Sequence, residues 1–244
     1  MIFKFIFVIF TLFSNIIWAE NLKYSTALFV GDSHSYGAFG QEIDKILRQY
    51  ADKVVSVASC GASASTWLEK SDNFKSTNCG YWKKTSPQKE IRTASHQLNS
   101  LKSEISELKP QVTVIALGTN MLGDVQGFHS ELKAVDKLIQ QVQQAGSRCL
   151  WIGPPDVSKN PFKKNLDELN LELKKYVEKR NCTYLSSTGL TKYNFTKSDG
   201  IHYPPMESKR WGEQISAQIR SLLDSGVVSQ PKKGPAGHPT TFSR

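Results

Sequence analysis

The chain has 244 residues, of which 39% are hydrophobic, so it fits one domain with a full apolar core. Its 31 Lys and Arg outnumber its 22 Asp and Glu, which leaves a formal net charge of +9. That charge suits an anionic polymer, such as an acidic or cell-wall polysaccharide, or an anionic membrane face. Nucleic acid is the less favoured partner, because the chain has no nucleic-acid motif and its N-terminus predicts export.

The N-terminus has the pattern of a secretory signal peptide. Lys4 precedes the apolar stretch 5–18, and the small residue Ala19 follows it. The alternative is a membrane anchor, but the stretch is shorter than the roughly 20 residues that span a bilayer. We therefore expect residues 1–19 to be removed on export to the periplasm or the extracellular space. The mature protein would start near Glu20, without stable insertion in the membrane.

Strand and helix patterns alternate along the rest of the chain. Short apolar runs predict strands at residues 27–30, 54–57, 112–117, 149–152 and 183–185. Apolar residues at helical spacing predict helices within residues 39–50, 98–108, 132–142, 166–177 and 211–223. This alternation predicts an α/β fold with a mostly parallel sheet that helices cover on both faces.

Two segments fall outside this scheme. Residues 225–244 combine Lys, Pro and Gly with few apolar residues, which predicts a disordered basic tail. Residues 62–90 form a long connection, and such loops are usually functional or stapled. The folded domain is therefore expected to span residues 20–224.

Four cysteines occur, an even number, and they allow three pairings. Export favours disulfides over buried thiols. A zinc site is the least favoured alternative, because no pair has the C-x-x-C spacing. The cysteines are Cys60, Cys79, Cys149 and Cys182.

Polar residues and a glycine follow three of the predicted strands, where α/β sheets bind ligands. Ser33 follows the first strand, Gly61 the second and Asn120 the third. Asp199 and His202 lie together on one late loop. A hydroxyl nucleophile needs a base, and the base needs an orienting acid, so the serine, histidine and aspartate supply a catalytic triad. Alone, the serine is more often a helix cap and the asparagine a turn residue.

These residues lie in four short blocks that resemble the sequence blocks of the SGNH (GDSL-type) hydrolases. The blocks are Gly31-Asp32-Ser33, a lone Gly61, Gly118-Thr119-Asn120 and Asp199-x-x-His202, and they extend over nearly the whole predicted domain. The resemblance implies a three-layer α/β/α sandwich of flavodoxin-like type with a five-stranded, mostly parallel sheet. It also implies ester hydrolysis through an acyl-enzyme, and we expect no cofactor and no metal.

The resemblance also implies a role for each matching residue. Ser33 would be the nucleophile, His202 the base and Asp199 its orienting acid. The oxyanion hole would be formed by the backbone N–H groups of Ser33 and Gly61 and by the side chain of Asn120. Close backbone approach at a glycine and a fixed amide donor are what a developing oxyanion requires.

The same resemblance makes the fourth and fifth predicted strands neighbours. Cys149 and Cys182, at the starts of those strands, could then approach within the roughly 4.4–6.8 Å between Cα atoms that a disulfide requires. We therefore expect this pair to be joined, and Cys60 to be joined to Cys79 across the long loop.

Three further residues are candidates for substrate binding. His34 follows the nucleophile at a position where the family more often has an apolar residue, and it could line the acyl pocket; a solvated or capping role is the alternative. Trp67 and Trp82 lie in segment 62–90 among several lysines, and flat aromatic faces stack on sugar rings. The alternative for these two is a small satellite core around Cys79. Asp32 is expected to hold the turn.

The leading interpretation is a secreted esterase that removes O-acetyl groups from an envelope or extracellular polysaccharide, such as peptidoglycan. A lipase, lysophospholipase or thioesterase is the main alternative within the same family. A polysaccharide O-acetyltransferase would use the same triad and would exclude water from the acyl-enzyme. A non-catalytic carbohydrate-binding protein of the same fold is the alternative from a different class.

Overall fold

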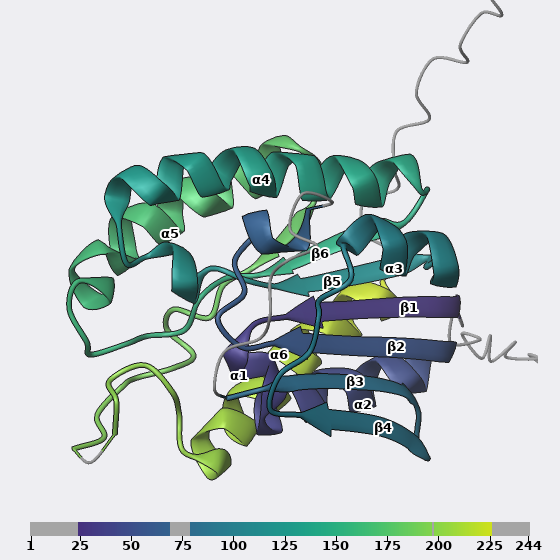
Figure 1. Cartoon of the computed structure of the whole chain (residues 1–244), viewed down its shortest axis with the longest axis horizontal. Helices are drawn as coiled ribbons and strands as arrows, with labels where there is room; N and C mark the ends of the chain where they lie inside the picture. The colour runs from purple at the N-terminus through teal and green to yellow at the C-terminus, as the bar shows by residue number, and fades with distance from the viewer. Residues whose placement is uncertain (1–23, 69–78, 197, 226–244) are drawn as a thin grey trace, which may run out of the picture.

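The computed structural model describes residues 24–68, 79–196 and 198–225 (Figure 1). The predicted signal peptide, residues 1–19, lies outside the described residues, and so do residues 226–244 of the predicted tail. None of the helices that are described combines the length and the apolar character needed to cross a bilayer.

A mixed sheet of seven strands forms the middle layer of the described part of the chain. Its order is β4-β3-β2-β1-β5-β6-β7. The strands are β1 (Tyr24–Gly31), β2 (Ala51–Ser59), β3 (Tyr81–Ser86), β4 (Lys89–Thr93), β5 (Val112–Ala116), β6 (Arg148–Ile152) and β7 (Thr183–Leu185). The five strands from β2 to β7 in this order are parallel, with the strand order of the flavodoxin-like fold. The hairpin of β3 and β4 extends the sheet in antiparallel fashion beside β2.

Helices cover both faces of the sheet (Figure 1). One face carries α1 (Ser33–Tyr36), α2 (Ala38–Tyr50) and α6 (Pro205–Asp224); the other carries α3 (Leu101–Leu108), α4 (Val125–Gln144) and α5 (Phe162–Lys179). Successive strand residues point to opposite faces, so β1 supplies both cores. Ala27 and Phe29 pack toward α2 and α6, whereas Leu28 and Val30 pack toward α3, α4 and α5. The predicted α/β/α sandwich is confirmed.

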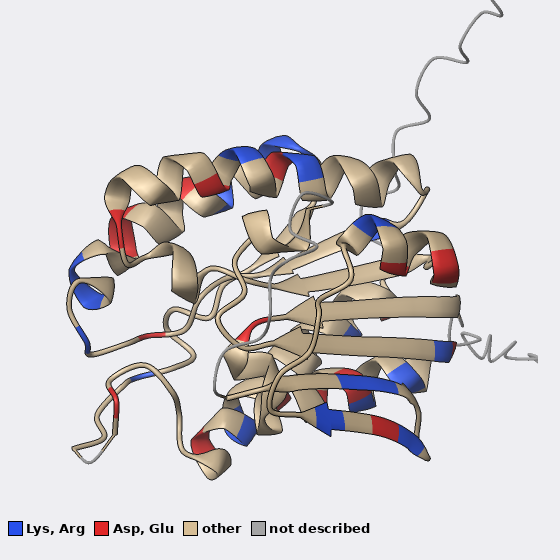
Figure 2. Ribbon diagram, in the orientation of Figure 1, with Lys and Arg blue, Asp and Glu red and all other residues tan. Residues whose placement is uncertain are grey.

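The β3–β4 hairpin corrects the prediction that residues 62–90 form one long loop and that the sheet has five strands. β4 is exposed along most of its length, so it lacks the alternation of apolar and polar residues that marks a strand in a sequence. The charges of β3 are matched by tertiary contacts. Basic and acidic residues both occur along the hairpin (Figure 2). Lys83 bonds both carboxylate oxygens of Glu104 at 2.8 Å, and Lys84 bonds Asp44 at 2.7 Å. These lysines are therefore engaged in ion pairs within the fold.

The four cysteines form two disulfides, in the pairing expected from the sequence. Cys60 is joined to Cys79, with 5.6 Å between the Cα atoms, and this bond ties the end of β2 to the start of the hairpin. Cys149 on β6 is joined to Cys182, next to β7, with 4.7 Å between the Cα atoms. The second bond therefore links neighbouring strands at one edge of the sheet.

Candidate active site

Ser33 is the first residue of α1, directly after the turn that leaves β1. The Asp32 side chain caps this short helix, because its Oδ1 accepts the His34 N–H at 3.0 Å. The turn is tight: a Cβ atom on Gly31 would lie 2.0 Å from Ser35 Oγ, so only glycine fits. The turn therefore holds the Ser33 hydroxyl at the carboxyl end of the sheet, and Asp32 has the turn-holding role that the sequence predicts.

Asp199 and His202 lie on the loop between β7 and α6. Asp199 Oδ1 accepts the backbone N–H groups of Ile201 at 2.9 Å and of His202 at 2.8 Å. The Tyr193 hydroxyl, from an earlier part of the same loop, donates to the His202 carbonyl at 3.0 Å and accepts the Gly200 N–H at 3.1 Å. No sequence pattern marks Tyr193 for this role, because its partners are backbone atoms and any residue type can supply them.

The three predicted triad residues meet in one chain of hydrogen bonds. His202 Nε2 lies 2.8 Å from Ser33 Oγ, and His202 Nδ1 lies 2.5 Å from Asp199 Oδ2. In the tautomer whose Nδ1–H donates to Asp199, Nε2 is free to accept the serine proton. The side chains of His202 and Asp199 are 45% and 48% exposed, so a large substrate can reach them.

The electrostatics of this chain favour a charged aspartate. Burial acts to raise the pKa of Asp199, but the hydrogen bonds from the His202 ring and from the backbone N–H groups of His202 and Ile201 outweigh it. The pKa is lowered to about 2. Asp199 is therefore ionised at any pH where the imidazole can act as a base, and it can stabilise the imidazolium that a proton transfer would create.

Three hydrogen-bond donors follow the ends of three adjacent strands. Gly31 of β1 pairs with Ala58 of β2 and Ala116 of β5, so Ser33, Gly61 and Asn120 all come shortly after the same level of the sheet. The backbone N–H groups of Ser33 and Gly61 have no acceptor among the residues that the structure describes. Gly61 has a φ of 80°, a conformation that favours glycine.

Asn120 lies on the short 3-10 helix Thr119–Met121. Its side-chain amide donates to the Ala62 carbonyl at 2.8 Å, which leaves its second N–H available to a ligand. The asparagine therefore stabilises the neighbouring turn and presents a donor at the same time. This contact also links the segments that carry Asn120 and Gly61.

His34 is buried beside the triad. Its ring centroid lies 5.3 Å from that of His202 and 5.4 Å from that of Trp211, which it meets edge-on. Burial lowers the pKa of His34 to about 3, and the charge of His202 adds to the effect, so His34 stays neutral. Its Nε2 has no hydrogen-bond partner in the described part of the chain. Burial raises the pKa of Asp32 to about 7, against the His34 N–H and the charge of His202.

A small cavity of about 10 Å³ lies at this end of the sheet, with room for about one water-sized group. Its walls include Asp32, His34, Thr119, Pro154 and Trp211. The walls are rigid, because the Trp211 ring stacks on Phe39 with 3.7 Å between centroids. A larger hollow of about 270 Å³ opens between α2 and α6, and none of the triad residues lines either the small cavity or this hollow.

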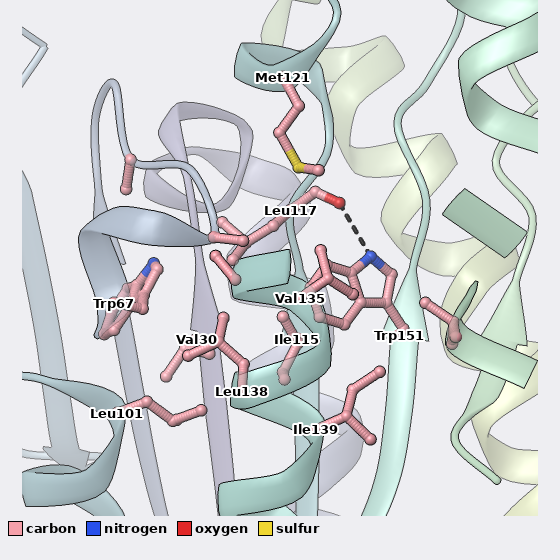
Figure 3. Packing of buried hydrophobic residues seen from close by; sticks show 14 of the residues in the cluster. Val30, Trp67, Leu101, Ile115, Leu117, Met121, Val135, Leu138, Ile139 and Trp151 are labelled. Atoms are coloured by element: carbon pink, nitrogen blue, oxygen red, sulfur yellow. Dashed lines mark hydrogen bonds between the residues drawn. The ribbon is translucent and has the colours of Figure 1, made fainter. Parts of the chain in front are cut away.

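The two tryptophans predicted to bind sugar do not face the site, and that prediction is wrong. Trp67 and Trp82 are both 0% exposed. Trp67 lies among Val30, Leu101 and their neighbours in the core under α4 (Figure 3). Trp82 packs on the other face of the sheet and donates to Glu90 at 3.0 Å. Large aromatic side chains gain most from burial, and a buried ring offers no face to a sugar.

Comparison with known proteins identifies the fold. No model of a known protein family matches the chain, and no curated protein sequence matches it. Among solved structures, Est24, a carbohydrate acetylesterase from Sinorhizobium meliloti, has a TM-score of 0.55 and 16% identity over 81% of this chain and 99% of its own. An aryl esterase from M. smegmatis has a TM-score of 0.55 and 14% identity over 81% of this chain and 99% of its own. A GDSL-like lipase from Bacteroides thetaiotaomicron has a TM-score of 0.55 and 11% identity over 83% of this chain and 89% of its own. The chain therefore has the fold of the SGNH (GDSL-type) hydrolases.

Proposed function

We propose that this protein is an exported serine esterase that works through an acyl-enzyme, with residues 20–224 as its hydrolase domain. The observation that supports the proposal most is the pair of contacts that join Ser33 to His202 and His202 to Asp199. A single contact of this kind occurs on many surfaces. A serine, an imidazole and a carboxylate in the correct order are the requirement of nucleophilic catalysis.

In the proposed first step, Ser33 Oγ attacks the ester carbonyl carbon while His202 Nε2 takes the hydroxyl proton. Asp199 stabilises the imidazolium. The negative charge that forms on the carbonyl oxygen is bound by the N–H groups of Ser33 and Gly61 and by the Asn120 amide. The carbon–oxygen bond to the alcohol then breaks, His202 returns its proton to the alcohol oxygen, and the acyl group stays on Ser33.

In the second step, water attacks the acyl carbon and gives its proton to His202. The ester bond to Ser33 breaks, the proton returns to Ser33 Oγ and the acid leaves. The exposure of His202 favours this outcome over transfer to another sugar, because a transferase must keep water away from the acyl-enzyme. A purely sugar-binding protein would have no use for the aligned triad.

We propose an O-acetylated cell-envelope or extracellular polysaccharide, such as peptidoglycan, as the substrate. The small cavity lined by Asp32 and His34, the two chain neighbours of Ser33, has room for about one water-sized group, which suits a short acyl group better than a long chain. The exposed triad suits a polymer, and the net charge of +9 suits an anionic one. One protein of the same fold, Est24, is a carbohydrate acetylesterase. Two disulfides and the expected signal peptide support export to the periplasm or beyond.

The lipase, lysophospholipase or thioesterase alternative would need an apolar groove for a long acyl chain. Each buried methylene contributes about 0.8 kcal/mol to binding, so a long-chain enzyme has a strong reason to provide one. GDSL-like lipases occur among the proteins of this fold, so the acyl length must be measured.

The test is acid release from a panel of acetylated glycans and of simple esters with acyl chains of two to about twelve carbons. We expect the acetyl esters to react fastest, and Ser33→Ala to abolish both turnover and labelling by a fluorophosphonate. Ser221→Ala, at an exposed serine on α6, is the matched control and should behave like the wild type. Turnover by Ser33→Ala close to the wild-type rate would refute the proposal.

A further inference from the structure

The segment 61–67, here called the oxyanion loop, follows β2 and contributes to the proposed oxyanion hole in two ways. Gly61 provides a backbone N–H, and the Ala62 carbonyl orients the Asn120 amide at 2.8 Å. The loop is anchored at both ends. Cys60 precedes it, held by its disulfide and by its N–H bond to the Gly80 carbonyl at 3.0 Å, and Trp67 closes it as a fully buried side chain.

Between these anchors, a side chain of α4 holds the loop in addition to the Asn120 amide. Glu131 of α4 accepts three hydrogen bonds from it: from Ser63 Oγ at 2.9 Å, from Ser65 N–H at 2.8 Å and from Ser65 Oγ at 2.5 Å. No ion pair of Glu131 with a lysine, arginine or histidine occurs among the described residues. A glutamate on a helix surface is usually solvated or paired with a cation. This one is committed to three neutral donors of a single loop.

The loop transmits this restraint because it is itself internally bonded. Ser63 N–H donates to Thr66 Oγ1 at 2.9 Å, and the same hydroxyl donates to the Ser63 carbonyl at 2.7 Å. The Ala62 N–H donates to the Ser59 carbonyl at 3.1 Å. A shift at Ser63 therefore moves Ala62, and with it the partner of the Asn120 amide.

Helix α4 is a firm support for the glutamate. Phe128 lies one turn before Glu131, Leu132 follows it directly and Val135 lies one turn after it. All three are almost completely buried. Asp124 caps the start of the helix by accepting the N–H groups of Gln126 and Gly127. The carboxylate of Glu131 is therefore fixed relative to the sheet, and it can fix the loop in turn.

We infer that Glu131 is a positioning residue for the oxyanion hole: through the oxyanion loop and its Ala62 carbonyl, it sets the Asn120 amide at the distance that the transition state requires. The inference rests on the proposed function. Catalysis is sensitive to such placement, and a misplacement of about 1 Å can cost about 100-fold in rate. Because the oxyanion hole binds the transition state more strongly than the substrate, the loss should fall on kcat and leave KM nearly unchanged.

The experiment compares Glu131→Ala and Glu131→Gln with the wild type on p-nitrophenyl acetate. We expect Glu131→Ala to lower kcat by about tenfold or more, with KM within about threefold of wild type. Glu131→Gln keeps one acceptor oxygen, so its kcat should lie between those of Glu131→Ala and the wild type. Asp136→Asn is the matched control, because Asp136 lies on the same helix and pairs with Arg180, away from the loop. It should leave kcat unchanged.

A double-mutant cycle separates positioning from a general loss of stability. If Glu131 acts through Asn120, then Glu131→Ala should cost less in an Asn120→Ala background than in the wild type. Fully multiplicative losses would overturn the inference, and so would a kcat for Glu131→Ala within twofold of the wild type. These results would leave the proposed esterase intact. A wild-type protein that hydrolyses no ester would instead remove the proposed function and the inference together.

Discussion

Asn120 offers the sharpest test of the site, because the structure gives it two separable roles. One amide N–H stabilises the turn by donating to the Ala62 carbonyl at 2.8 Å, and the other is available for the oxyanion. Loss of a turn hydrogen bond costs about 1 kcal/mol of stability. Loss of an oxyanion donor costs about 3–4 kcal/mol in the barrier, which is a fall in kcat of roughly 100- to 1,000-fold. Asn120→Ala should show both effects.

The chain contains a matched control for the turn role. Asn165 also donates its side-chain amide to a backbone carbonyl at 2.8 Å, that of Leu122, two residues after Asn120. Asn165→Ala should therefore lower the free energy of unfolding by about the same 1 kcal/mol while leaving kcat within a few-fold of wild type. The assay is kcat on acetyl esters, with urea unfolding in parallel. If the two variants lose the same factor in kcat, Asn120 is a turn residue and the oxyanion assignment is wrong.

Three further predictions concern stability, pH and acyl length. Replacing both Cys149 and Cys182 by Ala opens a loop of sequence separation 33, and loop entropy predicts a loss of roughly 4 kcal/mol in urea unfolding; a loss below about 1 kcal/mol would contradict this. Burial raises the pKa of Asp32 to about 7, above its unfolded value of 3.8, so folding is favoured below the unfolded pKa and this contribution is lost as the pH rises through about 7. Asp32→Asn should therefore raise the Tm relative to wild type at pH 8 and have little effect at pH 4. An equal change in Tm at both pH values would refute the raised pKa of Asp32. His34→Ala should enlarge the cavity and raise the ratio of butyryl to acetyl ester turnover about tenfold, whereas an unchanged ratio would exclude His34 from the acyl pocket.

The amino-acid sequence alone predicts the parallel strands, the layers and the residues that meet in the site. The strands of the parallel sheet are buried on both faces, so they are continuous apolar runs, and the helices between them keep a helical period. Ser33, Gly61 and Asn120 could be placed because parallel strands bring their carboxyl ends to one edge of the sheet. Asp199 and His202 could be paired because they are three residues apart on one loop.

What the sequence leaves open depends on contacts between distant residues. After the buried Tyr81 and Trp82, the β3–β4 hairpin is mostly polar, and its lysines are tolerated because Glu104 and Asp44, on other elements, face them. Trp67 and Trp82 look like an exposed sugar platform until the fold shows that both rings fill the core. Glu131 is one acidic residue among many on amphipathic helices, and only the approach of the oxyanion loop gives it three donors. Periodicity records which face of an element is buried, but the identity of the partner is set by packing in three dimensions.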